Sequence, residues 1–326
     1  MKKVVAAALL LLASIGVLFL FVSPRAPKGD VELTVGQISK PLSVFALTQE
    51  RSVRIFAAGD MLFDRNIRLM SERYGEDYPF SCIGDLIKSA DFAVANLEGP
   101  ITAHASKSIG SVPGSYDNYF FTFPTTTAKL LARQGFGAVD IGNNHITNFG
   151  IEGLWSTHTY LNEAGVGYFG GIDGDEGIYQ VDIQGIPVSF LGYNEFGGSS
   201  PRDVANRILE EKKQGRVVIV YTHWGDEYVD SSPRLRPIAE LFAESGASAV
   251  IGSHPHVVLG SEYIGDTLVY YSLGNFIFDQ YFNDDVSHGL ALILSVGKDG
   301  RVTAEEHPTT IYRDGRTCPT VQESHI

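Results

Sequence analysis

The chain has 326 residues, of which 44% are hydrophobic and 19% charged, a composition typical of a packed core that argues against a disordered chain. Its formal net charge of −13, with no long run of Lys or Arg, argues against nucleic acid as a main partner. The two cysteines, Cys82 and Cys318, are too few for a disulfide framework or a cysteine-based zinc site, although they could form one long-range disulfide outside the cytoplasm.

The N-terminus has the pattern of a membrane anchor. Lys2 and Lys3 precede an uncharged apolar run over residues 4–22, which as a helix is about 28 Å long and matches the hydrocarbon core of a bilayer. The run is long for a secretory peptide and lacks a small-x-small cleavage site, so an uncleaved anchor over residues 1–22 is favoured over a cleaved signal. The positive start predicts a single-pass protein of the cell membrane whose globular part is extracytoplasmic. Residues 23–50 are predicted to be a stalk.

Residues 51–326 have the pattern of one α/β domain. Short apolar runs predict buried strands at 54–59, 92–95, 138–141, 188–191, 217–221, 249–251 and 268–271. Longer segments between several of them predict helices at 126–134, 150–164, 202–213 and 233–245. This alternation favours a largely parallel arrangement, and two consecutive strands within 290–311 predict an antiparallel edge or a second sheet.

Polar residues follow five of the predicted strands. Because the carboxyl ends of parallel strands lie at one edge of a sheet, the five loops are expected to converge on one cleft. They would bring together Asp60, Glu98, Asn144, His145, His223, His254 and His256. This set of oxygen and imidazole ligands without a thiolate suits Mn²⁺, Fe²⁺ or Zn²⁺, and two-metal hydrolytic sites use such mixtures.

Each of these residues also has a purely structural interpretation. A single histidine at a strand end is more often a hydrogen-bonded loop residue than a ligand, and Asp or Asn there is often a turn former. However, four of the nine histidines fall in this pattern, and Pro255 restrains the backbone between His254 and His256. Taken together, the pattern favours a site for one or two divalent metal ions.

At these residues the sequence resembles the calcineurin-like metallophosphoesterases, whose pattern is D-x-H, G-D-x-x-D, G-N-H, a lone His and G-H-x-H. The last three elements appear as residues 142–145, His223 and residues 253–256. Asp60 matches the first element, but Leu62 stands where its histidine is expected. The second element is absent as written, and Glu98 stands where a bridging acid is expected.

A narrower resemblance, to the CapA family of capsule (poly-γ-glutamate) synthesis proteins, covers about residues 53–282. The segments that carry it, in order and spacing, are 59–65, 96–100, 143–145, 223–228, 252–256 and 272–276. The resemblance implies a four-layer α/β/β/α metallophosphatase-like sandwich preceded by one transmembrane helix. It also implies a role in making or exporting poly-γ-glutamate, with the polymer and its membrane synthase as partners.

The metallophosphoesterase resemblance also implies roles for the clustered residues. Glu98 would bridge two metal ions, and Asn144, His223 and His254 would complete the site of one of them. Asp60 and His256 would hold the second ion, whose site lacks one ligand because residue 62 is Leu. His145 would act as a general acid at the leaving group or would stabilise developing charge.

Four further residues have two interpretations each. Arg65 could clamp a phosphate or carboxylate, or it could form a surface ion pair with Asp64 or Glu72. Trp224 could face the substrate, although a loop anchor packed against the core is favoured. Asp226 and Glu227 could orient His223 or be solvated loop acids.

Asn275 could hydrogen-bond the site from another loop and contribute to substrate binding. The favoured function is a metal-dependent hydrolase of a phosphoester or an amide in capsule synthesis. The alternatives are a non-catalytic scaffold that binds the polymer or assists the synthase, and an envelope phosphoesterase unrelated to capsule.

Overall fold

A computed structural model describes residues 52–172, 177–198 and 200–320. The predicted anchor at 1–22 and the predicted stalk at 23–50 lie outside the described residues. Among the residues that are described, no helix is both long enough and apolar enough to span a bilayer.

The first sheet has eight strands, and its centre is parallel. Its order is β14-β13-β12-β1-β2-β3-β4, and β11 also pairs with β1. The parallel strands are β1 (Ser52–Met61), β2 (Phe92–Leu97), β3 (Phe136–Asp140), β4 (Gly167–Phe169) and β11 (Asn275–Ile277). The antiparallel edge consists of β12 (His288–Gly297), β13 (Val302–Ile311) and β14 (Thr317–Pro319). The expected antiparallel edge within 290–311 is therefore confirmed.

The second sheet has six strands in the order β5-β6-β7-β8-β10-β9. Four of them run parallel, namely β6 (Ile186–Asn194), β7 (Val217–His223), β8 (Ala249–Ser253) and β10 (Thr267–Leu273). The two edge strands, β5 (Ile178–Ile183) and β9 (Val258–Ile264), are antiparallel to their neighbours. The predicted strands are thus divided between two sheets.

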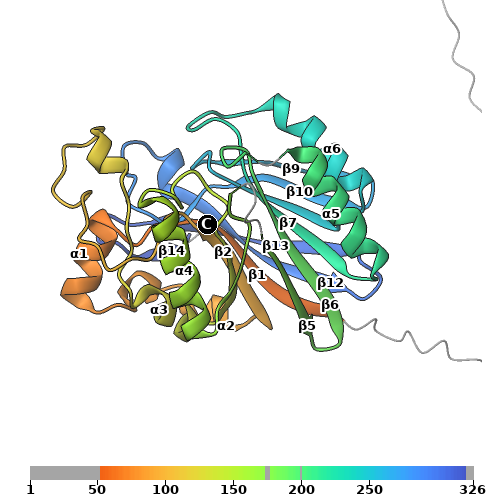
Figure 1. The fold of residues 1–326 in the computed structure, drawn as a ribbon, viewed down its shortest axis with the longest axis horizontal. Coiled ribbons are helices and arrows are strands. Elements are labelled where there is room, and N and C mark those ends of the chain that lie inside the picture. The colour runs from red at the N-terminus through yellow and green to blue at the C-terminus, as the bar shows by residue number, and fades with distance from the viewer. Residues whose placement is uncertain (1–51, 173–176, 199, 321–326) are drawn as a thin grey trace, which may run out of the picture. The chain divides into compact units, whose positions relative to one another are not determined.

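Helices cover the outer face of each sheet, as Figure 1 shows. The first sheet carries α1 (Arg65–Tyr74), α2 (Gly84–Lys88), α3 (Thr127–Gln134) and α4 (Gly150–Ala164), and the second carries α5 (Pro201–Lys213) and α6 (Arg236–Glu244). Single 3₁₀ turns lie at Tyr78–Phe80, Tyr116–Tyr119, Pro233–Leu235 and Asp285–Ser287. The layers therefore run helices, sheet, sheet, helices.

The burial of both faces of β1 explains why its residues form a continuous apolar run in the sequence. Alternate residues of a strand face opposite sides. Phe56 and Ala58 pack under the first helix layer, whereas Ile55 and Ala57 pack between the two sheets. Both faces of the strand are dry, so both sets of side chains are apolar.

A disulfide joins Cys82 to Cys318, with Cα atoms 4.8 Å apart. Cys82 lies just before α2 and Cys318 lies in β14. The bond therefore ties the C-terminal strand to the helical layer of the first sheet. The long-range disulfide that the sequence left open is present.

Candidate metal centre

Strand register places polar side chains in one row at the carboxyl ends of the first sheet. Asp60 of β1 lies beside Asn96 of β2 on one side and beside Asn275 of β11 on the other. The close approach of β11 requires Gly59, because a Cβ at this position would lie 1.9 Å from the carbonyl oxygen of Gly274. The pairing of β1 with β11 beside Asp60 therefore depends on a glycine at position 59.

The second sheet supplies the histidines from its own strand ends. His223 ends β7, in register with Ser253, and residues 254–256 follow β8 directly. The first sheet brings Asn144 to the same place, since Asn144 Oδ1 lies 3.0 Å from His223 Nε2. The expected convergence of loops is thus seen, but at the meeting point of two sheets and not at the edge of one.

Three donor atoms lie at the spacing that one metal ion requires. His223 Nε2 is 3.0 Å from Asn144 Oδ1 and 3.1 Å from His254 Nδ1. Ligand atoms that each lie 2.0–2.1 Å from a common ion are about 3.0 to 3.4 Å apart. Asn144, His223 and His254 therefore fit as ligands of one ion.

Asp60, His256 and Glu98 form the adjoining half of the cluster. His256 Nδ1 is 3.3 Å from Asp60 Oδ2, and His256 Nε2 is 3.6 Å from Glu98 Oε1. Glu98, His254 and His256 each offer a ligand atom within 4.8 Å of the other two. Glu98 is thus placed between the two halves, as a bridging acid would be.

Glu98 is the residue whose environment most requires a cation. Its side chain is fully buried, and neither carboxylate oxygen has a hydrogen-bond partner among the described residues. Burial raises the pKa of Glu98 well above its usual range, and the charge of Asp60 raises it further. A buried carboxylate without partners is costly, and a bound divalent ion would offset that cost. The residues present therefore fit a metal ion.

Asp60, His223 and His254 are held in the forms that bind metals. Burial alone would raise the pKa of Asp60, but His256 and two further hydrogen bonds lower it below its ordinary value. Burial and the neighbouring histidines lower the pKa of His223 far below its usual range and that of His254 to about 4. Carboxylate and neutral imidazole are the ligating forms of these side chains.

The His254-Pro255-His256 segment has a strained backbone. His254 has a φ of 93° and His256 a φ of 61°, a region that non-glycine residues seldom adopt. Two hydrogen bonds hold the segment, because the amide of His254 donates to Asp60 Oδ2 at 3.1 Å and the amide of Tyr228 donates to the Pro255 carbonyl at 2.9 Å. These hydrogen bonds hold the backbone of the segment in place, whereas the restraint expected from Pro255 itself stays a prediction.

His145 lies at the open side of the cluster, with Nε2 3.9 Å from Glu98 Oε1. The Asn148 amide nitrogen is 3.2 Å from His145 Nδ1 and can donate to it, so a neutral ring carries its hydrogen on Nε2. Burial, and then the electrostatic effect of the neighbouring His256, lower the pKa of His145 to about 3. The ring can therefore donate a hydrogen bond from Nε2 to a substrate oxygen.

Arg65 is already engaged by other groups of the protein. Its guanidinium forms an ion pair with Asp279 and packs against the rings of Phe121 and Phe278 at 5.0 and 5.6 Å. The expected partners were wrong, because Asp64 caps α1 and Glu72 pairs with Arg68. The prediction of a free anion clamp at Arg65 is thus weakened, since an acid already neutralises the cation.

Two other residues predicted to bind substrate are buried. Trp224 is fully buried, and its indole N–H donates to the Tyr271 carbonyl at 2.9 Å, so it anchors the loop and the prediction of a substrate-facing plate is wrong. Asn275 is also fully buried, with Oδ1 3.0 Å from His256 Nδ1, so it positions a ligand and does not reach the substrate.

The side chains that support His223 differ from those considered in the sequence. Asp226 pairs with Arg234, and both Asp226 and Glu227 are exposed. Ser253 Oγ and Asn96 Nδ2 lie 3.1 and 3.2 Å from His223 Nδ1 instead. Asn96 Nδ2 also donates to Asp60 Oδ1 at 2.7 Å, so it links the two halves of the cluster. Its position in the polar segment 96–100 at a strand end was the only signal of this role.

Comparisons with known proteins identify the family of this chain. The family described as bacterial capsule synthesis protein PGA_cap matches residues 54–280. The capsule biosynthesis protein CapA of Bacillus anthracis is 29% identical over 244 residues, and the PGA biosynthesis protein CapA of Bacillus subtilis (strain 168) is 28% identical over 247. Each match covers 68% of this chain, but only 59% and 62% of the respective relative.

A solved structure shows that the fold recurs elsewhere. A novel phosphatase from Mycoplasma pneumoniae superimposes with a TM-score of 0.51 and 11% identity, covering 80% of this chain and 94% of that one. At this identity the likeness concerns the fold alone. The family match extends over most of the described residues and includes every residue of the cluster, and the chain therefore belongs to the bacterial capsule synthesis protein PGA_cap family.

Proposed function

We propose that this chain is a membrane-anchored, extracytoplasmic, metal-dependent hydrolase that acts in the synthesis or export of a poly-γ-glutamate capsule. The observation that carries the proposal is the pair of buried Glu98 oxygens, which have no hydrogen-bond partner among the described residues and lie beside His254 and His256. The names of the two CapA relatives support the capsule role. The Cys82–Cys318 disulfide supports a location outside the cytoplasm, where such bonds persist.

In the proposed reaction, some residues of the chain would bind the metal ions and another would donate a hydrogen to the bond being cleaved. Glu98, Asn144, His223 and His254 would hold one divalent ion, of Mn, Fe or Zn, and Asp60 and His256 would help to hold a second. A bound ion would supply Lewis acidity and activate water near neutral pH. His145 would donate from Nε2 to an oxygen or nitrogen of the bond being cleaved.

A non-catalytic scaffold is the second candidate, and one observation favours it. Leu62 occupies the place of the missing histidine and is fully buried in the core, so it offers no ligand to the second ion. A centre that has lost one ligand could keep a structural ion and bind the polymer or its synthase without hydrolysis. The third candidate is an envelope phosphoesterase unrelated to capsule.

The first test is metal content. We would purify the full-length chain in mild detergent and measure transition metal per chain by elemental analysis, before and after reconstitution with Mn²⁺ or Zn²⁺. The double variant His223→Ala with His254→Ala should lose the metal. The control variant His288→Ala with His307→Ala removes two histidines outside the cluster and should keep it.

The outcomes separate the candidates. One or two ions per chain, lost only in the cluster variant, would support the site. Hydrolysis assays with phosphoesters and γ-glutamyl peptides would then distinguish the hydrolase from the scaffold, and a phosphoesterase would act on the first substrate class alone. A chain that takes up no metal after reconstitution cannot be a hydrolase of this kind.

A further inference from the structure

A hollow of about 500 Å³ opens beside the metal centre. Three contacts connect the two. Tyr228 lines the hollow and stacks on His256, with ring centroids 5.8 Å apart. Gln280 lines it and accepts a hydrogen bond from Asn275, which contacts His256. Arg65 lines it and packs on Phe121, which in turn contacts the ring of His145. A molecule held in this hollow would therefore lie next to the cluster.

The lining of the hollow carries a surplus of positive charge. Its ionisable cations are Arg65 and Arg313, and its one acid is Asp279. Asp279 is already paired with Arg65, so these two groups neutralise each other. Arg313 has no carboxylate partner among the described residues. In a chain with a net charge of −13, this is a local cation in a hollow next to a candidate active site.

Arg313 is held in place although it is exposed. One guanidinium nitrogen, Nη2, donates to the Tyr281 carbonyl at 3.0 Å, and the guanidinium lies over the Tyr281 ring at 5.5 Å. Its own carbonyl accepts from Asn66 Nδ2 at 3.2 Å. Its other guanidinium N–H groups have no hydrogen-bond partner among the described residues, so they can bind a ligand. Because the turn that carries Arg313 leads into β14, the Cys82–Cys318 disulfide also tethers it.

The rest of the lining is aromatic. Tyr119, Tyr228 and Phe282 are 47%, 38% and 63% exposed, and Tyr281 is a fourth aromatic residue in the lining. Aromatic faces of this kind suit the aliphatic stems of a chain, whereas a single guanidinium suits a planar carboxylate, which it can bind with two parallel hydrogen bonds. A phosphate-rich ligand would call for several cations, and the lining of the hollow offers only one, Arg313, that is not paired with an acid among the described residues.

We infer that this hollow is the subsite that reads a free carboxylate on the substrate chain, and that Arg313 is its specificity-determining residue. The inference rests on the proposed function, because it takes the metal centre as the place where the same substrate is processed. Arg313 lies beyond residues 54–280, which the family match covers. The residue is thus a feature of this chain that the family relationship does not assign.

The test compares two peptides that differ only in the negatively charged groups that Arg313 is proposed to bind. One is a pentamer of γ-linked glutamate with free α-carboxylates, and the other is the same pentamer with every α-carboxylate converted to the amide. Binding of each labelled peptide to the full-length chain would be followed by fluorescence anisotropy. We expect the carboxylate peptide to bind at least about tenfold more tightly than the amide.

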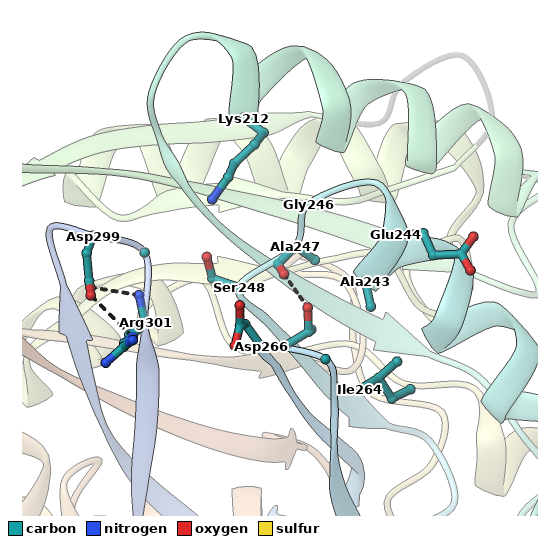
Figure 2. A pocket seen from close by; sticks show the side chains of 13 residues that line it. Lys212, Ala243, Glu244, Gly246, Ala247, Ser248, Ile264, Asp266, Asp299 and Arg301 are labelled. Atoms are coloured by element: carbon teal, nitrogen blue, oxygen red, sulfur yellow. Dashed lines mark hydrogen bonds and ion pairs between the residues drawn. The ribbon is translucent and has the colours of Figure 1, made fainter.

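Three variants test whether Arg313 causes the preference for the carboxylate peptide. Arg313→Gln should weaken binding of the carboxylate peptide about tenfold and leave the amide peptide unchanged, while Arg313→Lys should retain part of the preference. The control is Arg301→Gln, which removes the same charge at a different hollow. Figure 2 shows that hollow, where Arg301 lies beside Asp299 on the turn between β12 and β13.

Results with the wild-type chain or with the variants could each overturn the inference. It fails if the wild-type chain does not distinguish the two peptides, or if Arg313→Gln and Arg301→Gln weaken binding by the same factor. Metal content, measured on the same samples, reports on the proposed function separately. A chain that discriminates the peptides but takes up no metal would keep the subsite and lose the hydrolase.

Discussion

Asp140, at the end of β3, allows a quantitative test of how the buried carboxylates affect stability. Its side chain is fully buried, Oδ1 accepts the Gly142 amide at 2.9 Å, and Oδ2 has no partner among the described residues. Burial raises the pKa of Asp140 from 3.8 to about 8. The proton is therefore bound more tightly in the folded chain than in the unfolded one.

The sign of the pH dependence follows from this difference. A carboxyl whose folded pKa is raised contributes its full stability below about pH 3.8, and that stability is lost as the pH rises through about 8. At about 1.4 kcal/mol for each pKa unit the loss has an upper limit of about 6 kcal/mol. Water penetration and relaxation reduce such costs, and we expect a change of about 2 kcal/mol between pH 5 and pH 9.

The assay is urea unfolding of metal-free protein at pH 5, 7 and 9, because a bound cation would alter the charge felt by Asp140. The variant Asp140→Asn keeps an acceptor for the Gly142 amide and cannot ionise, so its stability relative to wild type should increase with pH. The control Asp182→Asn removes an exposed carboxylate that caps the Gly185 amide at 2.6 Å. A relative stability that stays flat with pH, or the same trend in the control, would refute the reasoning.

Two further predictions concern residues that support the site from outside the ligand set. Asn96→Ala should lower metal affinity about 10- to 100-fold in a chelator competition, because Asn96 contacts both Asp60 and His223; an unchanged affinity would contradict this role. Replacing Cys82 and Cys318 together by serine should lower the free energy of unfolding by about 2 to 5 kcal/mol, since the bond closes a loop of 236 residues. Equal urea midpoints for wild type under oxidising conditions and the double variant would contradict it.

The strands could be predicted from the sequence because both sheets are covered on both faces. The run at 54–59 lies within β1, and the runs at 217–221 and 268–271 lie within β7 and β10. An apolar run indicates that a strand is buried, but it does not indicate to which sheet the strand belongs. The division of the strands into two sheets could therefore not be predicted from the periodicity. Only the resemblance to a known fold indicated four layers. The helix α1 was missed, because its residues are mostly polar and only Ile67 is buried.

Site residues that lie at or directly after a predicted strand could be predicted from the sequence. Contacts between residues far apart in the sequence could not. Asp60, Glu98 and His223 each lie at or directly after a strand, and they meet as expected. Arg65 and Asp279 are 214 positions apart, and nothing local to either residue indicates the ion pair. The aromatic character of Trp224 was equally consistent with a substrate contact and with core packing, and only its full burial decides between them.

The two halves of the metal centre should differ in affinity, because they differ in the number of ligands that the chain supplies. In the proposed assignment Glu98, Asn144, His223 and His254 would offer four side chains to one ion, whereas Asp60, Glu98 and His256 would offer three to the other. Leu62 cannot supply the missing one, since it packs in the core under the first helix layer.

We therefore expect equilibrium dialysis against Mn²⁺ or Zn²⁺ to show one tightly bound ion per chain and a second that is lost on mild chelation. His254→Ala should remove the tight ion, and His256→Ala should remove the weak one while leaving the tight one in place. Two ions of equal affinity in the wild-type chain would show that a ligand from another source completes the second site. A single-ion enzyme remains chemically competent, because one ion can both orient the substrate and activate water. We therefore expect Leu62 to weaken one half of the proposed centre without abolishing the proposed hydrolysis.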